Sequence, residues 1–324
     1  MNKEKKAMIV TITLNPALDQ TLNFTKFHVG KVNRVAKQRL DPAGKGINVA
    51  KVLNSLGLDV AVSGFLGRDN ANIFEQYFQA QGIFSRFITV DGATRVNTKI
   101  IDETTGQVSE INFPGIHYGA SNLQQLENVI KQLTLESEYF VLSGSLPEQA
   151  PLDIYHKFTE ILKSYDCKVF LDTSGGALIE GIKAKPYAIK PNLDELKQLM
   201  GHSVKQELDV LKAVDRLISG GIAKVVISLG GKGALVADRT QRLLVRPLEV
   251  KIGSTVGAGD ALVAGLVYGE VQGMSLEEQA CWATAVAVAS IAQPGTQAGS
   301  VNDVEKLLPN VIIDHLEEGI FLLV

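Results

Sequence analysis

The stretch Gly-Ser-Thr-Val-Gly-Ala-Gly-Asp at residues 253–260 runs directly into the apolar segment Ala-Leu-Val-Ala-Gly-Leu-Val at 261–267. Small residues just before an apolar helix let backbone N–H groups crowd together, and the helix dipole adds partial positive charge there. The stretch therefore predicts an anion-binding turn formed by the amides of 257–259. Asp260 follows in the first helical turn, where its carboxylate can serve as a general base beside a bound phosphate. The alternative interpretation is a glycine-rich turn that only permits tight helix packing.

The composition is typical of a globular protein and argues against a polyanionic partner. The chain has 324 residues, of which 45% are hydrophobic and 21% are charged. This length fits one large α/β core with a small addition. Because 32 basic residues face 35 acidic ones, for a net charge of −3, no strong positive field is expected, and nucleic acid is not an expected partner.

The cysteines and the apolar segments indicate the compartment. Cys167 and Cys281 lie far apart and form no metal-ligand or disulfide pattern, which favours a reducing, cytoplasmic location. The charged residues 1–6 are not followed by an apolar segment of signal-peptide length. Runs of about 18 apolar residues are missing from the sequence, so we expect no membrane span.

Strand-like and helix-like segments alternate along most of the chain. Apolar and β-branched residues predict strands at 8–14, 60–65, 139–142, 168–172, 187–190 and 224–229. Helical spacing of apolar residues predicts a helix opening at 44–46 and further helices at 71–81, 152–163, 193–200 and 208–219. This alternation predicts an α/β fold with a mainly parallel central sheet and helices on both faces, in a single domain spanning 1–324.

Two segments without helices, at about 20–42 and 94–115, interrupt this alternation. The second one predicts a hairpin around Thr104-Thr105-Gly106. Together they predict a small projecting β-sheet that acts as a lid and excludes water during phosphoryl transfer. The apolar side chains Phe24, Phe27 and Val29 are expected on an exposed face of this lid, so we expect a homodimer formed through it.

A second motif, Ala-Gly-Lys-Gly-Ile-Asn at 43–48, places a lysine between glycines at the start of a helix. Lys45 can close over a phosphate held by backbone amides, and Asn48 can donate to a sugar hydroxyl. The alternative for Lys45 is a solvated side chain in a flexible turn. Asp19 follows the first strand and can accept hydrogen bonds from substrate hydroxyls, or it can bond to its own backbone in a turn.

Further charged and glycine-rich positions complete the set of candidates. Arg95 and Lys99 alternate on the lid hairpin and can grip an anionic substrate, or they are solvated charges on an edge strand. In the stretch at 190–195, Glu195 can cap a helix or approach Mg²⁺ through water. The loop at 228–234 contains glycines that permit close approach of a ligand, although a plain tight hairpin explains them equally well.

In order and spacing, these stretches resemble the ribokinase-like sugar kinases of the phosphofructokinase-B family. Residues 43–50, with Gly57 and Gly67, match the N-terminal signature of that family, and residues 255–260 match its C-terminal signature. The stretches at 190–195 and 228–233 fall where the family places nucleotide elements. Residues 13–19 and 106–115 are most similar to 1-phosphofructokinases and next most similar to tagatose-6-phosphate kinases.

The resemblance implies a kinase that uses ATP and Mg²⁺, and it implies roles for individual residues. Asp260 would be the catalytic base, assisted by the amides of Gly257, Ala258 and Gly259. The phosphate of the sugar would be held by Lys45, Arg95 and Lys99, and the sugar would be oriented by Asp19, Gly44 and Asn48. The nucleotide would be lined by Lys190, Asn192, Ser228, Gly230, Gly231, Gly233 and Thr255, with Glu195 tied to Mg²⁺ as metal partner.

Three functions follow from this resemblance. The first is phosphorylation of fructose 1-phosphate to fructose 1,6-bisphosphate, and the second is the same chemistry on tagatose 6-phosphate. The third is a sugar-phosphate-binding regulator that has kept the fold without catalysis. The intact Asp260 argues against the third function. Residues 284–289 are mostly Ala and Val, where family members often carry a polar residue that contacts adenine, so the base contacts are not predicted.

Overall fold

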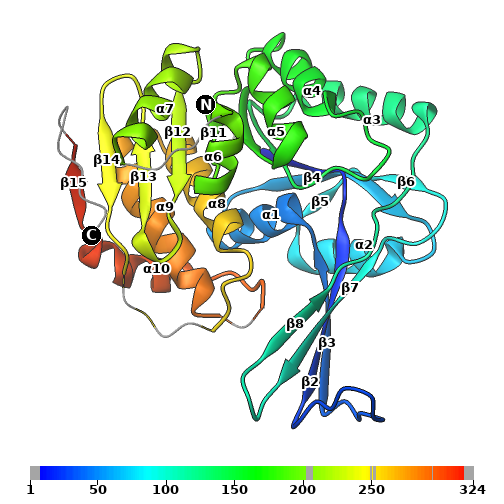
Figure 1. The fold of residues 1–324 in the computed structure, drawn as a ribbon. Coiled ribbons are helices and arrows are strands. Elements are labelled where there is room, and N and C mark those ends of the chain that lie inside the picture. The colour runs from blue at the N-terminus through cyan, green and yellow to red at the C-terminus, as the bar shows by residue number, and fades with distance from the viewer. Residues whose placement is uncertain (1–7, 202–206, 249, 251–252, 294, 317–324) are drawn as a thin grey trace, which may run out of the picture.

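The computed structural model describes residues 8–201, 207–248, 250, 253–293 and 295–316 (Figure 1). The helices are α1 (Lys45–Ser55), α2 (Ala71–Gln81), α3 (Ala120–Leu133), α4 (Ile154–Lys163), α5 (Gly175–Gly181), α6 (Leu193–Met200), α7 (Glu207–Ser219), α8 (Ala258–Val271), α9 (Leu276–Ile291) and α10 (Val301–Leu307). Within these described ranges, no helix is long and apolar enough to cross a lipid bilayer.

Most strands form one large sheet. The strands of the protein are β1 (Ile9–Thr13), β2 (Ala17–Phe24), β3 (Lys37–Ala43), β4 (Val60–Gly67), β5 (Phe84–Ser85), β6 (Ile88–Val90), β7 (Val96–Asp102), β8 (Val108–Ile111), β9 (Tyr139–Ser143), β10 (Lys168–Asp172), β11 (Ala188–Ile189), β12 (Lys224–Ser228), β13 (Ala234–Ala237), β14 (Arg242–Val245) and β15 (Ile313–His315). The large sheet runs β15-β14-β13-β12-β11-β10-β9-β1-β4-β5, and β6 also pairs with β4. The pairs from β5 to β12 are parallel, and those from β12 to β15 are antiparallel.

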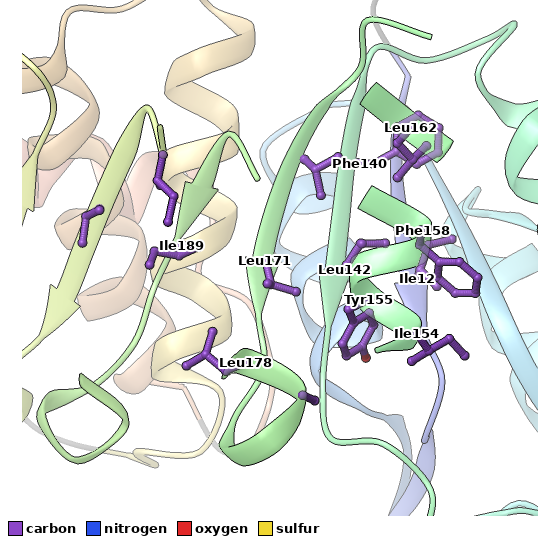
Figure 2. Close-up of a cluster of buried hydrophobic side chains, with 14 of the residues drawn as sticks. Ile12, Phe140, Leu142, Ile154, Tyr155, Phe158, Leu162, Leu171, Leu178 and Ile189 are labelled. Atoms are coloured by element: carbon purple, nitrogen blue, oxygen red, sulfur yellow. The ribbon is translucent and has the colours of Figure 1, made fainter. Parts of the chain in front are cut away.

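Helices cover both faces of this sheet, with α3 to α7 on one face and α1, α2, α8, α9 and α10 on the other (Figure 1). On the first face, Ile12, Leu142 and Leu171 come from the neighbouring strands β1, β9 and β10, and they pack in one cluster with Tyr155 and Phe158 of α4 (Figure 2). Burial on both faces explains why these strands are apolar throughout rather than alternating. The predicted fold class is confirmed.

The second sheet runs β3-β2-β7-β8 and projects from the body of the protein (Figure 1). Its strands lie in the two segments that sequence analysis singled out, and β7 and β8 form the predicted antiparallel hairpin. Strand β3 continues into α1 through Gly44, whose φ of 125° is strained for residues with a side chain. The projecting sheet is therefore covalently continuous with α1.

One alternative interpretation and one expectation for this region were wrong. Asp19 does not lie in a turn, because the turn after β1 is short and Asp19 is the third residue of β2. Phe24 is not exposed on the face of the lid. It is 5% exposed and packs edge-on against Phe27, with 5.2 Å between the ring centroids. The loop after β2 folds back, because the amide of Phe27 donates to Asp102, and the two rings cover each other. Val29 is 90% exposed, as expected.

A buried carboxylate ties the far end of α8 to the amino ends of the central strands. Glu270 accepts hydrogen bonds from Lys168 Nζ at 2.5 Å and from Tyr187 Oη at 2.7 Å, and it also bonds Lys224. Burial alone would raise the pKa of Glu270, but these hydrogen bonds outweigh burial and lower the pKa to about 2. The cluster fixes α8 at the edge of the sheet opposite to the one where the helix begins.

Glu270→Gln should make the free energy of unfolding vary less with pH in the acid range. A depressed pKa contributes stability that is fully present above the unfolded value of about 4.5 and is lost as pH falls through about 2. At pH 7 we expect the variant to lose about 2 to 3 kcal/mol of unfolding free energy, and this difference should shrink as pH falls. Urea denaturation at several pH values measures it. Glu180→Gln, which breaks an exposed pair with Lys183, is the control and should change little. Equal pH slopes for wild type and Glu270→Gln would contradict the assignment.

Candidate active site

The predicted site residues gather at the carboxyl ends of the parallel strands, where ligands bind in open α/β sheets. A cleft of about 380 Å³ lies between the root of the projecting sheet and the start of α8. Ten predicted residues line it: Asp19, Gly44, Lys45, Asn48, Arg95, Thr255, Gly257, Ala258, Gly259 and Asp260. These residues come from both halves of the sequence, so the fold brings together positions more than 200 residues apart.

The start of α8 is the turn that the sequence predicts to bind an anion. Gly257 precedes the helix with a φ of 83°, a left-handed conformation that favours glycine, and α8 begins at Ala258. The first amides of a helix lack carbonyl partners within it, which suits this turn to an anion, although the amide of Ala258 donates to the carbonyl of Thr255 at 3.3 Å. At Gly259 a β-carbon would lie 3.3 Å from Lys190 Nζ. The turn therefore combines the N-terminus of a helix with a neighbouring ammonium group.

Asp260 lies in the first turn of α8 and is 5% exposed. Asn48 Nδ2 of α1 donates to Asp260 Oδ2 at 2.8 Å, which orients the carboxylate. Burial is the largest influence on the pKa of Asp260 and raises it, and Asp172 raises it further. Lys45, Asn48 and Lys190 lower this pKa. The result is a pKa raised to about 6. A carboxylate with a pKa close to neutral pH is suited to general base catalysis.

Asp172, which sequence analysis missed, holds two predicted lysines. It is the last residue of β10 and is 1% exposed. Lys45 Nζ donates to its Oδ2 at 3.2 Å, and Lys190 Nζ lies 3.3 Å from its Oδ1. Burial would lower the pKa of Lys45, but Asp172 and Asp260 outweigh burial and raise it to about 12. The sequence did contain a signal for Asp172, because it is a carboxylate at the carboxyl end of a strand predicted to be parallel.

The other wall of the cleft lies at the root of the projecting sheet. Asp19 accepts a hydrogen bond from Asn97 Nδ2 at 3.3 Å, and burial raises its pKa. Arg95 donates to the backbone carbonyls of Asn15, Pro16 and Phe113 at 3.0 to 3.2 Å. These bonds use three of its five N–H groups and leave two for a ligand.

Lys99 does not line this cleft itself, and it pairs with Glu110 at 3.0 Å. It lines a neighbouring hollow that shares Asp19 and Asn97 with the cleft. The cleft also contains residues that sequence analysis did not select, namely Asn15, Asn97, Ser145 and Ser174. Isolated polar residues carry no distinctive spacing, which explains why the sequence did not reveal them.

The predicted nucleotide residues follow β11 and β12 at the same edge of the sheet. Asn192 and Ser228 form a parallel bridge, and the loop from Gly230 to Lys232 is a short 3-10 turn that leads through Gly233 into β13. Glu195 caps α6: its Oε2 accepts from the amide of Asn192 at 2.8 Å, and Asn192 Oδ1 accepts from the amide of Glu195. The capping alternative for Glu195 therefore holds in this structure. Across the described residues, no group of three or more His, Cys, Asp or Glu side chains is arranged to hold a metal.

The sequence can be compared with known proteins now that this geometry is established. Residues 6–303 match the profile of the pfkB family of carbohydrate kinases. The chain is 40% identical over 308 residues to the 1-phosphofructokinase of Vibrio cholerae, which covers 95% of this chain and 97% of that protein. It is also 40% identical over 285 residues to the 1-phosphofructokinase of Escherichia coli K12, covering 88% and 91% of the two chains.

Solved structures agree with this assignment. Escherichia coli phosphofructokinase-2 in complex with potassium superposes with a TM-score of 0.88 at 29% identity, covering 94% of this chain and 99% of that one. A Thermotoga maritima protein described as a possible 1-phosphofructokinase superposes with a TM-score of 0.87 at 28% identity, covering 96% and 100%. The family resemblance found in the sequence is confirmed: this chain belongs to the pfkB family of carbohydrate kinases.

Proposed function

We propose that this kinase transfers the γ-phosphoryl group of ATP to fructose 1-phosphate and forms fructose 1,6-bisphosphate and ADP. The observation that carries the proposal is the buried Asp260 beside the anion-binding turn, in one cleft with Lys45 and Arg95. The relatives at 40% identity are themselves 1-phosphofructokinases. A site that only bound sugar phosphate would have no use for a buried base with a pKa near neutral pH.

In the proposed reaction, Asp260 takes the proton from the free sugar hydroxyl that faces it. The hydroxyl oxygen forms a bond to the γ-phosphorus while the bond to the bridging oxygen of ADP breaks. The amides of Gly257, Ala258 and Gly259 stabilise the negative charge on the moving phosphoryl group. Asp260 then releases its proton to solvent as the product leaves.

The sugar and its phosphate occupy the rest of the cleft in this proposal. Asp19, Gly44 and Asn48 orient the sugar hydroxyls. Arg95, with two N–H groups available, holds the phosphate that the substrate already carries. Lys45 was expected to share that phosphate, but its ion pair with Asp172 favours a place beside the reacting end of the substrate. Lys99 would reach the substrate only if its pair with Glu110 opened.

The nucleotide is proposed to lie along the ends of β11 and β12. Its contacts would come from Lys190, Asn192, Ser228, Gly230, Gly231, Gly233 and Thr255. Mg²⁺, when bound, supplies positive charge to the phosphates of the nucleotide. The helix cap engages Oε2 of Glu195, so its Oε1 is the oxygen that would reach Mg²⁺ through water. The cytoplasmic location expected from the sequence remains a prediction.

The substrate assignment is tested with a panel of sugar phosphates. Coupled ADP release should be fastest with fructose 1-phosphate, and tagatose 6-phosphate is the main alternative acceptor.

Asp260→Asn should lower turnover by roughly 10²- to 10⁴-fold while leaving ATP affinity nearly unchanged, because the base acts only on the reacting hydroxyl. Wild-type turnover should fall below about pH 6, where Asp260 becomes protonated. Preference for another sugar phosphate would overturn the substrate, and near-normal turnover of Asp260→Asn would overturn the mechanism.

Substitutions of Arg95 and Lys45 should have different effects on fructose 1-phosphate and on free fructose. Losing a charge-assisted hydrogen bond to a phosphate costs about 1.5 to 3 kcal/mol, so Arg95→Ala should raise the Michaelis constant for fructose 1-phosphate by roughly 10- to 100-fold. Activity on free fructose should barely change in this variant. Lys45→Ala should reduce turnover of both sugars, since Lys45 faces the reacting end. Equal losses on both sugars in Arg95→Ala would show that Arg95 only holds the loop carbonyls.

We also propose that the projecting sheet is a lid, formed by about 20–42 and 94–115 within the single domain 1–324, and that it joins two copies of the chain. Strand alternation places Asp19, Thr21 and Arg39 on the face toward the cleft and Leu22, Leu40 and Ile100 on the other face. Ile111 lies in the same outer row as Leu40, and these two are 46% and 42% exposed. A sheet face this apolar is a typical surface for a second copy.

Charged substitutions on the outer face of the lid should therefore separate the dimer. Ile100→Asp should give a monomer in sedimentation velocity at micromolar concentration, with weaker binding of the sugar phosphate. Val108→Asp is the matched control, because Val108 lies on the opposite face of the same hairpin and is already 53% exposed. A wild-type monomer with full activity would refute the dimer, and equal effects of both variants would refute the choice of face.

A further inference from the structure

Two lysines from different parts of the fold meet at one buried carboxylate. Lys45 belongs to α1, which borders the sugar side of the cleft, and Lys190 follows β11 on the proposed nucleotide side. Both approach Asp172, one at each carboxylate oxygen, at 3.2 and 3.3 Å. The side chains of Asp172 and Lys190 are 1% and 7% exposed, whereas Lys45 is 39% exposed. The pairs therefore connect the two sides of the site.

This arrangement places positive charge where the phosphoryl group must pass. Lys190 Nζ borders Gly259 in the anion-binding turn, and Lys45 is close enough to Asp260 to influence its titration. Two ammonium groups near one point repel each other, and the half-exposed Lys45 could relieve that repulsion by turning to solvent. Asp172 between them reduces the group to a net charge of +1 and removes the reason for Lys45 to leave.

We propose that Asp172 is a positioning residue that holds Lys45 and Lys190 on the two sides of the path taken by the transferred phosphoryl group. This inference rests on the proposed phosphoryl transfer and adds a residue to it. Asp172 itself does not bond to the substrate. It acts through the two lysines, which stabilise charge on the phosphoryl oxygens while the group moves between donor and acceptor.

The same carboxylate influences the catalytic base. The charged groups that face Asp260 are Lys45 and Lys51 from α1, Lys190 after β11 and Asp172 at the end of β10, and Asn48 donates a hydrogen bond. Asp172 raises the pKa of Asp260, and Lys190 lowers it. Because Asp172 holds Lys45 in place, Asp172→Asn frees Lys45, the strongest of the charges that lower the pKa of Asp260, so this pKa should rise in that variant. In a Lys45→Met background the same substitution removes only the repulsion from Asp172, so the pKa of Asp260 should fall. A purely structural role would not produce this change of sign.

The first test compares Asp172→Asn with a matched control. Asp172→Asn keeps the shape of the side chain and removes the charge, so we expect kcat to fall by roughly 10- to 100-fold with little change in the Michaelis constant for ATP. Glu270→Gln removes a carboxylate that also bridges two lysines on this sheet, but at the opposite edge. It should leave kcat within about twofold of wild type, since no phosphoryl group passes there. Adding Asp172→Asn to Lys45→Met should cost little beyond Lys45→Met alone, because the two residues act as one unit.

The second test needs no sugar substrate. Carboxyl NMR of the free enzyme should show Asp260 titrating at higher pH in Asp172→Asn and in Lys190→Met than in wild type, and at lower pH in the double variant of Lys45→Met and Asp172→Asn than in Lys45→Met alone. Lys190→Met also keeps the inference testable if Asp172→Asn fails to fold. Unmoved titrations, or additive losses in the double variant, would overturn the positioning role. If wild type fails to phosphorylate fructose 1-phosphate while the titrations move as expected, only the substrate assignment fails.

Discussion

Two buried carboxylates at one edge of the sheet are the constraint on which the rest of the site depends. Asp172 and Asp260 are both almost fully removed from water, and an uncompensated charge in such a place is strongly disfavoured. The compensating groups are Lys45, Asn48 and Lys190, which come from α1 and from the end of β11. The cluster can form only where α1, α8, β10 and β11 meet, so a few ion pairs and hydrogen bonds depend on the parallel pairing of β10 with β11 and on the placement of both helices beside these strands.

Helix α8 is fixed by charge at both of its ends. Near its first turn, Asp260 accepts from Asn48, and near its last turn, Glu270 bonds two lysines and a tyrosine that belong to the other edge of the sheet. Between these ends the helix is buried and mostly apolar, so it has no hydrophilic face along which it could shift toward solvent. The catalytic carboxylate thus stands on a rigid element, as precise chemistry requires.

Local patterns predicted most of the fold, whereas several contacts within the site depend on the tertiary arrangement. Helices α2 and α6 agree with prediction residue for residue, because their apolar spacing and their glycine or asparagine caps are encoded locally. The position of Asp172 between two lysines depends on strand order, which no local pattern contains. Phe24 was wrongly expected to be exposed, since its burial depends on a loop that folds back through Asp102. The capping role of Glu195 was one of two readings, and only the observed hydrogen bonds distinguish them.

Strand β3 leads directly into α1 through Gly44, so a movement of the projecting sheet would also move the start of α1. Pro42 lies at the end of β3 that leads into α1, and its backbone carbonyl accepts a hydrogen bond from Lys51 Nζ of α1. Strand and helix are therefore joined by this hydrogen bond as well as by the chain itself. A tilt of the sheet would therefore reach the first turn of α1, which begins with Lys45. A restraint applied at the distant tip, such as contact with a second subunit, would reach the reacting end of the cleft. Catalytic rate in this architecture would then vary with the concentration of the enzyme itself.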